Sequence, residues 1–179
     1  KHKNTADDGL LHGTYYAQID VKDYGTITAE LYADTAPITV TNFVNLVNQG
    51  FYDGLTFHRI ISGFMIQGGD PLGNGTGGSE NKIKGEFSAN DVDNPLKHTR
   101  GVLSMARSSA YNSASSQFFI MHADATHLDG QYAAFGKVLS GMEIVDAICE
   151  NTPVTDGNGT VAKENQPVIT SIRMIDKPQ

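Results

Sequence analysis

The stretch that decides the fold is LTFHRIISGFMIQGGD, Leu55 to Asp70. Its β-branched and aromatic residues have the density of β-strands, which predicts strand structure broken at Gly63. An arginine, a histidine and a glutamine stand inside this apolar run. Burying a cation is costly unless it is paired, so the position of Arg59 requires a reason. Its head either reaches solvent at the rim of a strand or faces a functional groove.

The sequence on both sides of this stretch predicts more strands. Apolar and polar residues alternate with period two in Thr14–Val21, Gly25–Tyr32 and Gln166–Ile175, which is typical of a strand with one buried face, and three further segments are strand candidates. The predicted strands are Thr14–Val21, Gly25–Tyr32, Gly101–Arg107, Ser116–His122, Ala133–Leu139 and Gln166–Ile175. Many strands without βαβ alternation favour a single-domain antiparallel barrel or sandwich with helices at its ends.

Two segments show helical spacing instead. The first predicts a helix at Pro37–Asn48, with Asp34 or Thr35 as its N-cap. Its apolar stripe consists of Val40, Phe43, Val44 and Val47. The second lies within Gly141–Asn151, where the apolar face is formed by Met142, Val145 and Cys149.

Length and composition limit the possible classes of protein. The 179 residues suit one domain with a substantial core. A net charge of −7 with scattered basic residues argues against nucleic acid as a partner. No apolar run approaches the ~20 residues of a membrane span. We expect a flexible polar leader at residues 1–12 and one domain at residues 13–179. A soluble protein is expected, either cytoplasmic or exported with its signal segment removed.

Three other motifs suggest other functions, and each is incomplete. GNGTGG (Gly73–Gly78) matches a dinucleotide fingerprint, but the polar sequence behind it predicts no helix, so a loop with positive φ angles or close backbone approach fits better. His122 and His127 have no Glu or Cys at ligand spacing, so we predict no metal site and no cofactor. The serines of Ala106–Gln117 lack a G-x-S-x-G elbow, although a spatial triad stays possible.

The remaining motifs resemble those of the cyclophilins, the cyclosporin-binding class of peptidyl-prolyl cis–trans isomerases. FHRIISGFMIQGGD, NGTGG, SMA, SQFFI, LDG and FGKV follow one another in that family's order over about Gly13 to Asp176, and bacterial members look nearest. The resemblance implies an all-β fold, an eight-stranded antiparallel β-barrel capped by two α-helices. It also implies an isomerase that accelerates rotation about X–Pro bonds in unfolded or flexible polypeptides and assists protein folding.

The resemblance also assigns roles to individual residues. The family's catalytic arginine matches Arg59. The apolar pocket for the substrate proline ring matches Phe64, Met65, Phe119 and Leu128. The polar lining of the groove matches Gln67 and Gln117, and the stretch whose backbone pairs with the substrate matches Ala106 and Arg107. Two further groove positions, where animal members usually carry tryptophan and histidine, are occupied by His127 and Tyr132.

This chemistry needs neither a nucleophile nor a metal, because no covalent bond changes. Amide resonance sets a rotation barrier of ~18–20 kcal/mol, and the prolyl nitrogen gains a lone pair as the bond twists. A donor held against that nitrogen acts more strongly in the transition state, and Arg59 supplies permanently protonated donors. A proline-peptide binding or chaperone module with the same groove but no turnover is the alternative. We also predict a monomer that binds cyclosporin weakly, since His127 replaces a hydrogen-bonding tryptophan.

Overall fold

The computed structural model describes residues 8–179, which form eight strands, two α-helices and three short 3₁₀ helices. The strands are β1 (Thr14–Val21), β2 (Gly25–Tyr32), β3 (Phe57–Ile61), β4 (Met65–Gly68), β5 (Val102–Met105), β6 (Phe118–Met121), β7 (Ala134–Ser140) and β8 (Ile169–Ile175). The helices are α1 (Pro37–Asn48), α2 (Met142–Asn151), η1 (Ser88–Asn90), η2 (Thr126–Leu128) and η3 (Lys163–Asn165). Every predicted strand and both predicted α-helices are found, and β1, β2 and α1 have their predicted bounds.

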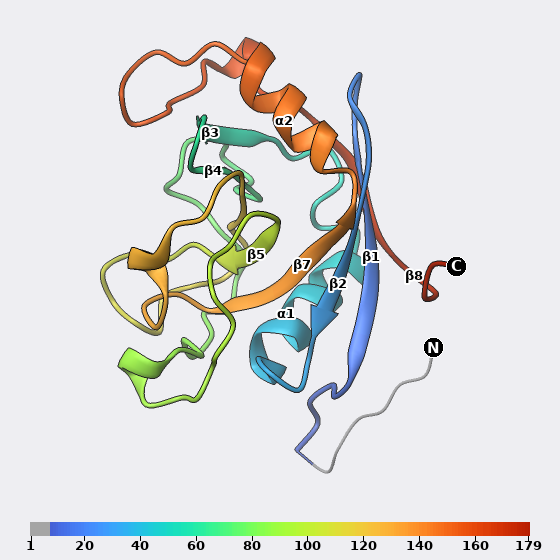
Figure 1. The fold of residues 1–179 in the computed structure, drawn as a ribbon, viewed down its shortest axis with the longest axis vertical. Coiled ribbons are helices and arrows are strands. Elements are labelled where there is room, and N and C mark those ends of the chain that lie inside the picture. The colour runs from blue at the N-terminus through green and yellow to red at the C-terminus, as the bar shows by residue number, and fades with distance from the viewer. Residues whose placement is uncertain (1–7) are drawn as a thin grey trace.

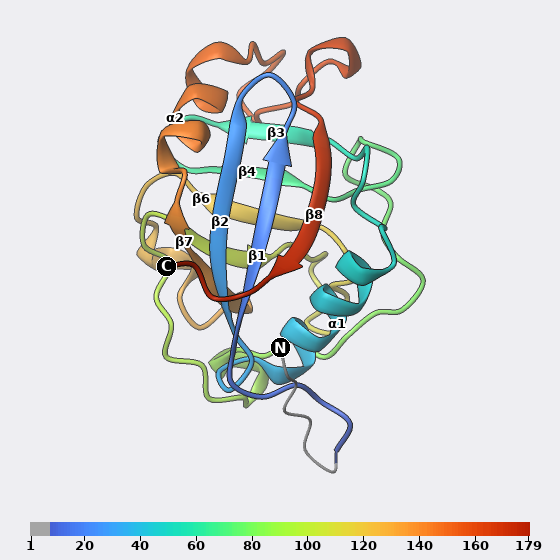
Figure 2. The same ribbon diagram turned by 90° about the vertical axis from the view of Figure 1, so that its right-hand side faces the viewer.

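The eight strands belong to one antiparallel sheet with the order β3-β4-β6-β5-β7-β2-β1-β8. The sheet curls, so that β1, β2 and β8 cross over β3, β4 and β6, as Figure 2 shows. Its two edges meet at one end, where the N–H of Gly54 donates to Ile169 O (2.8 Å) and the N–H of Ile169 donates to Leu55 O (2.7 Å). The helices α1 and α2 lie towards opposite ends of this curled half-barrel (Figure 1). The predicted fold class is confirmed.

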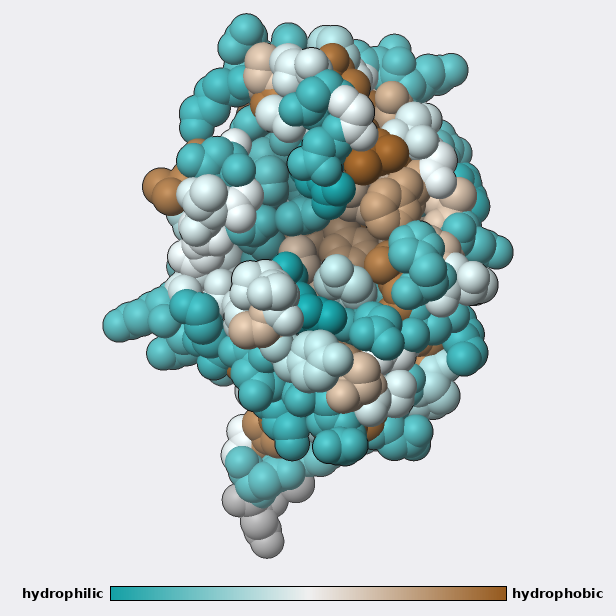
Figure 3. Space-filling model, turned by 90° about the vertical axis from the view of Figure 1, so that its left-hand side faces the viewer, coloured by the Kyte–Doolittle hydropathy of each residue, from teal (hydrophilic) through white to brown (hydrophobic). Residues whose placement is uncertain are grey.

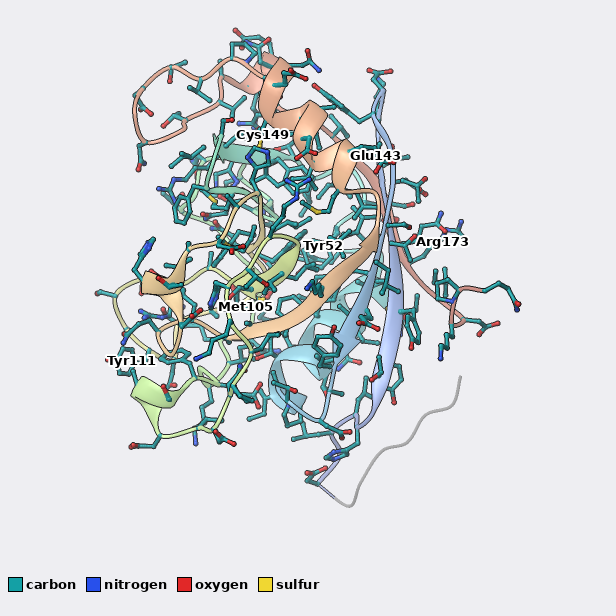
Figure 4. All side chains as sticks on the ribbon, viewed as in Figure 1. Tyr52, Met105, Tyr111, Glu143, Cys149 and Arg173 are labelled. Carbon is teal, nitrogen blue, oxygen red and sulfur yellow. The ribbon has the colours of Figure 1, made fainter. Side chains whose placement is uncertain are left out.

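The core fills the inside of the curled sheet, and α1 supplies part of it. All four residues of the predicted apolar stripe are buried, and Phe43 packs against three other aromatic rings at centroid distances of 5.2–5.6 Å. These rings belong to Tyr52, Phe118 and Phe135, all fully buried. Tyr52 points into the interior in Figure 4, and its hydroxyl donates to Ser116 O (2.8 Å). The predicted helix is therefore held in place mainly by the burial of its apolar face.

The start of α1 is capped by a residue that the sequence pattern does not indicate. Neither Asp34 nor Thr35 caps the helix, so that prediction was wrong; the N-cap is Ala36, which has no side-chain capping bond. The carboxylate of Glu86 accepts the N–H groups of Ile38 (3.0 Å) and Thr39 (2.8 Å) instead. Glu86 is 2% exposed, and its negative charge lies at the positive end of the helix dipole. A distant residue thus satisfies the free N–H groups of this helix end.

Replacing Glu86 with glutamine should lower the free energy of unfolding by about 1–3 kcal/mol, because an amide loses the charge and one of the two acceptor oxygens. Urea denaturation at neutral pH measures the loss. The matched control is Glu80→Gln, since Glu80 is exposed and near in sequence, and a change below about 0.5 kcal/mol is expected there. Equal effects of the two substitutions would contradict this capping role.

The predicted leader at residues 1–12 is only partly described, because residues 1–7 lie outside the described part of the chain. Leu11 packs against the core, and its N–H donates to Thr41 Oγ1 (2.8 Å). Gly13 N–H donates to Asp34 Oδ1 (2.9 Å). In residues 8–179 we find no helix with both the length and the apolar character needed to cross a lipid bilayer.

Candidate active site

Strand alternation creates a second apolar cluster on the outer face of the sheet. In β6, Phe118 and Ile120 point into the main core, whereas Phe119 and Met121 point outward. The outward cluster also includes Met65 on β4 and Leu128 in η2. Because the sheet curls, this cluster forms the floor of a surface depression rather than a second interior. Figure 3 shows a brown and tan hollow ringed by teal residues on the face that lies to the left in Figure 1.

A cavity of about 150 Å³ opens over this outer cluster. It brings together nine of the eleven site residues suggested by the sequence: Arg59, Phe64, Met65, Gln67, Ala106, Arg107, Phe119, Leu128 and Tyr132. They come from β3, β4, β6 and η2, from the turn between β3 and β4, and from the loops after β5 and after η2. The cavity therefore combines an apolar floor with a small number of long polar side chains at its edge, as small-ligand sites commonly do.

Arg59 is fixed at the edge of this cavity by a loop distant in sequence. Its Nε donates to Asn158 O (2.8 Å), and one terminal nitrogen donates to Asn158 Oδ1 (3.0 Å). The other terminal nitrogen donates to Gln67 Oε1 (3.3 Å). Asn158 lies in a tight turn that is closed by Asp156, whose carboxylate accepts N–H groups from that turn. A guanidinium has five N–H bonds, so two of them have no partner among residues 8–179.

A chain of side-chain amides continues from Arg59 along the groove. Gln67 Nε2 donates to Gln117 Oε1 (2.9 Å). Gln117 Nε2 in turn donates to the backbone oxygens of Gly75 (3.1 Å) and Gly77 (2.8 Å). Gln117 does not line the apolar cavity, but it borders a neighbouring cavity of about 290 Å³. The orientation of Gln67, and through it that of Arg59, is therefore coupled to the glycine-rich loop.

The glycine-rich loop folds around a carboxylate of the same chain. Asp70, 1% exposed, accepts the N–H groups of Leu72 (2.8 Å), Asn74 (3.1 Å), Gly75 (2.6 Å) and Gly77 (3.2 Å). Burial raises the pKa of Asp70, but these backbone donors together lower it further, and the net pKa is below the usual value.

The glycines of this loop are required for two different reasons. Gly73 and Gly75 have φ angles of +67° and +93°, and a side chain on Gly77 would collide with Asp70. This agrees with the predicted need for positive φ angles and close approach. No helix follows the loop before η1 at Ser88, so the phosphate-binding arrangement of a dinucleotide site is missing from this part of the chain.

A buried polar group supports the pocket floor from below. His98 is 1% exposed and stacks on Phe119 at 6.1 Å. Its Nδ1 lies 3.0 Å from Asp129 Oδ1, and its Nε2 lies 2.9 Å from Ser104 Oγ. Burial lowers the pKa of His98 although Asp129 opposes this shift, so the imidazole is neutral at neutral pH. A neutral ring that donates from Nδ1 and accepts at Nε2 satisfies both neighbours and fixes the orientation of the ring under Phe119.

His127 is the one suggested site residue that lines neither the 150 Å³ cavity nor the 290 Å³ cavity. Its ring lies 5.8 Å from that of Phe64, beside the cavity rather than in its lining. Three contributors were missed from the sequence: Asn158, His98 and Asp70. The turn signal DGNG marks a loop at Asn158 but does not indicate which strand that loop meets. Within residues 8–179, no cluster of three His, Cys, Asp or Glu side chains could hold a metal ion.

The chain is similar in sequence to known bacterial isomerases. The family model for cyclophilin type peptidyl-prolyl cis-trans isomerases matches residues 16–174. A peptidyl-prolyl cis-trans isomerase of Helicobacter pylori (strain J99) is 47% identical over 140 residues, covering 77% of this chain and 83% of that protein. Peptidyl-prolyl cis-trans isomerase B of Bacillus subtilis (strain 168) is 46% identical over 144 residues, covering 80% and 92%.

The fold agrees with solved structures of the same kind. A crystal structure of a Cryptosporidium parvum cyclophilin type isomerase superposes with a TM-score of 0.80 at 32% identity, covering 93% of this chain and all of that one. A second structure, in the presence of the dipeptide Ala-Pro, gives a TM-score of 0.79 at 34% identity, covering 90% and 99%. The family model, the identities with the relatives and the fold agree, and the chain belongs to the family of cyclophilin-type peptidyl-prolyl cis-trans isomerases.

Proposed function

We propose that the groove around Arg59 is the place where this chain accelerates rotation about X–Pro bonds of unfolded or flexible polypeptides. The apolar floor formed by Phe64, Met65, Phe119 and Leu128 holds the proline ring. Arg59 stands at the edge of that floor and interacts with the amide that twists. The structure of a relative in the presence of Ala-Pro supports a proline-containing polypeptide as the substrate.

The proposed mechanism uses the change in the prolyl nitrogen during rotation. Amide resonance is lost as the bond twists, and the nitrogen becomes pyramidal with a basic lone pair. A guanidinium N–H directed at this nitrogen binds the twisted amide more strongly than the planar one, which lowers the barrier. The ring held on Phe119 remains fixed while the other side of the amide turns. Because the apolar floor excludes water, the hydrogen bond from Arg59 is stronger than it would be in solvent.

One observation carries this proposal: Arg59 is held by Asn158 and Gln67 beside the apolar cavity and keeps two unpaired N–H bonds within the described part of the chain. A cation placed only for solubility would extend into solvent and need no such support. Exchange NMR on an X–Pro peptide tests the role of Arg59 directly, as set out in the Discussion. We further propose that the chain acts as a monomer, since residues of one copy supply the whole groove; size-exclusion chromatography measures this.

Weak cyclosporin binding is expected, because His127 occupies the position of a hydrogen-bonding tryptophan and lies against Phe64 at the side of the cavity. Calorimetry with the wild-type chain and with His127→Trp measures the difference. The substitution should tighten binding about tenfold, since an added hydrogen bond and its ring contact contribute about 1–1.5 kcal/mol. Nanomolar binding by the wild type, or no gain in His127→Trp, would refute this expectation.

A further inference from the structure

The side chain of Arg107 is half-buried and packs among aromatic rings at the edge of the groove. Its guanidinium carbon lies 4.5 Å from the ring centroid of Tyr132, 5.0 Å from that of Phe87 and 5.1 Å from that of Tyr111. These distances are within the range of attractive cation–π contacts. Tyr111 belongs to the loop between β5 and β6 and lies at the left edge of Figure 4. Three rings from three separate segments thus surround one cation.

The hydrogen bonds of Arg107 join two loops that border the groove. Its Nε and one terminal nitrogen donate to Gln131 O at 3.2 and 2.6 Å. The other terminal nitrogen donates to Ser108 O (2.9 Å) and, more weakly, to Ser109 O (3.4 Å). The loop after β5 is therefore tied to the loop that carries Tyr132. A planar fork of five donors can make these bonds and stack on a ring at the same time, which an ammonium cannot do.

Arg107 lies where two cavities meet. Arg107 lines both the 150 Å³ cavity over Phe119 and the 290 Å³ cavity beside it. Tyr132, held by Arg107 on one side, meets the ring of Phe119 edge-on at 5.9 Å on the other. A displacement of Arg107 would therefore change the position of Tyr132 in the lining of the 150 Å³ cavity. It would also change the wall between the 150 Å³ and the 290 Å³ cavities.

We propose that Arg107 is a positioning residue: its guanidinium fixes Tyr132 against Phe119 and so sets the affinity of the pocket for the proline side of the substrate. The inference rests on the proposed function, because it concerns the same pocket. It differs from the expectation drawn from the sequence, which gave this stretch a role through its backbone alone. The rate of bond rotation is assigned to Arg59, so loss of Arg107 should act mainly on substrate binding.

The experiment is a double-mutant cycle with the full chain, using Arg107→Met, Tyr132→Ala and the double variant. Arg107→Met should raise KM for an X–Pro peptide about threefold to tenfold, with a smaller fall in kcat, because the substitution removes a partly desolvated cation from the face of Tyr132. In the Tyr132→Ala background the same substitution should change KM less than about twofold. The matched control is Arg100→Met, since Arg100 pairs with Asp146, lines neither cavity and should alter neither constant.

Two results would overturn the inference. One is an unchanged KM in Arg107→Met. The other is an equal rise in KM when Arg107→Met is made in the wild type and in Tyr132→Ala, which would mean that Tyr132 does not transmit the effect. If Arg107→Met does not fold, Arg107→Lys tests the inference instead, because lysine keeps the charge and most of the bulk of the side chain. A raised KM in Arg107→Lys that is absent in the Tyr132→Ala background supports the inference, and an unchanged KM rejects it. A failure of the proposed function would appear differently, as normal turnover by Arg59→Ala.

Discussion

Replacing Arg59 with alanine should lower kcat for an X–Pro peptide by about 10²–10³-fold, the usual effect of removing one donor aimed at a transition state. Two N–H bonds of this guanidinium have no partner within residues 8–179, and Arg59 lines the same cavity as Phe119, so we propose them as the donors to the twisting amide. KM should change much less, because the proposed contacts of the proline ring with Phe119 and its neighbours stay intact. A protease-coupled or exchange-NMR assay measures both constants.

Two further variants make the Arg59 experiment specific. Arg59→Lys keeps the charge but loses the planar fork that bonds both Asn158 and Gln67, so it should recover little of the rate. Arg173→Ala is the matched control, since Arg173 is exposed on β8 and points away from the molecule in Figure 4. Full activity in Arg59→Lys would show that charge alone suffices, contrary to the proposed geometry.

The second large effect is expected at Asp70, whose replacement by alanine should lower the free energy of unfolding by on the order of 3–5 kcal/mol. Four backbone N–H groups lose their acceptor, and the remaining hydrogen bonds of the loop, such as those from Gln117 and Gln166, go to its backbone oxygens and leave these donors unpaired. Turnover per folded molecule should also fall, because Gln117 depends on Gly75 and Gly77 for its orientation. Urea denaturation and kcat/KM give the two values.

The Asp70 contribution should depend on pH in one direction. The pKa of Asp70 is lowered in the folded chain, so its ionised form stabilises the fold above the unfolded pKa. This stabilisation is lost as the pH falls below about 4, through the folded pKa. The stability difference between wild type and Asp70→Asn should therefore shrink between pH 7 and pH 3. Asp93→Ala, at an exposed carboxylate, is the control; a difference that stays constant with pH would contradict this role.

Local sequence patterns predicted the elements, because those patterns directly reflect burial. The alternation in Thr14–Val21 and the stripe through Phe43 are properties of one strand and one helix, and their bounds agree with the structure. Long-range partners were not predictable in this way. Glu86 caps a helix that begins 49 residues earlier, and Asn158 meets Arg59 across 99 residues.

In the candidate site too, the sequence indicated the residues themselves but not their long-range partners. The resemblance assigned the side chains of the pocket, and the structure brings nine of them together. It did not indicate what supports them, because Asp70 and His98 act from beneath the surface. The three rings around Arg107 likewise come from segments that no local pattern connects.

Exchange NMR on one X–Pro peptide, with wild type and Arg59→Ala compared at equal saturation, measures binding and rotation in the same sample. The result we expect is similar peptide binding by both proteins, with rapid cis–trans exchange in the wild type and an exchange rate near that of the free peptide in Arg59→Ala. Equal exchange rates in the two samples would mean that rotation does not depend on this guanidinium. Peptide binding by the wild type without faster exchange would mean that the groove binds peptides but does not catalyse rotation.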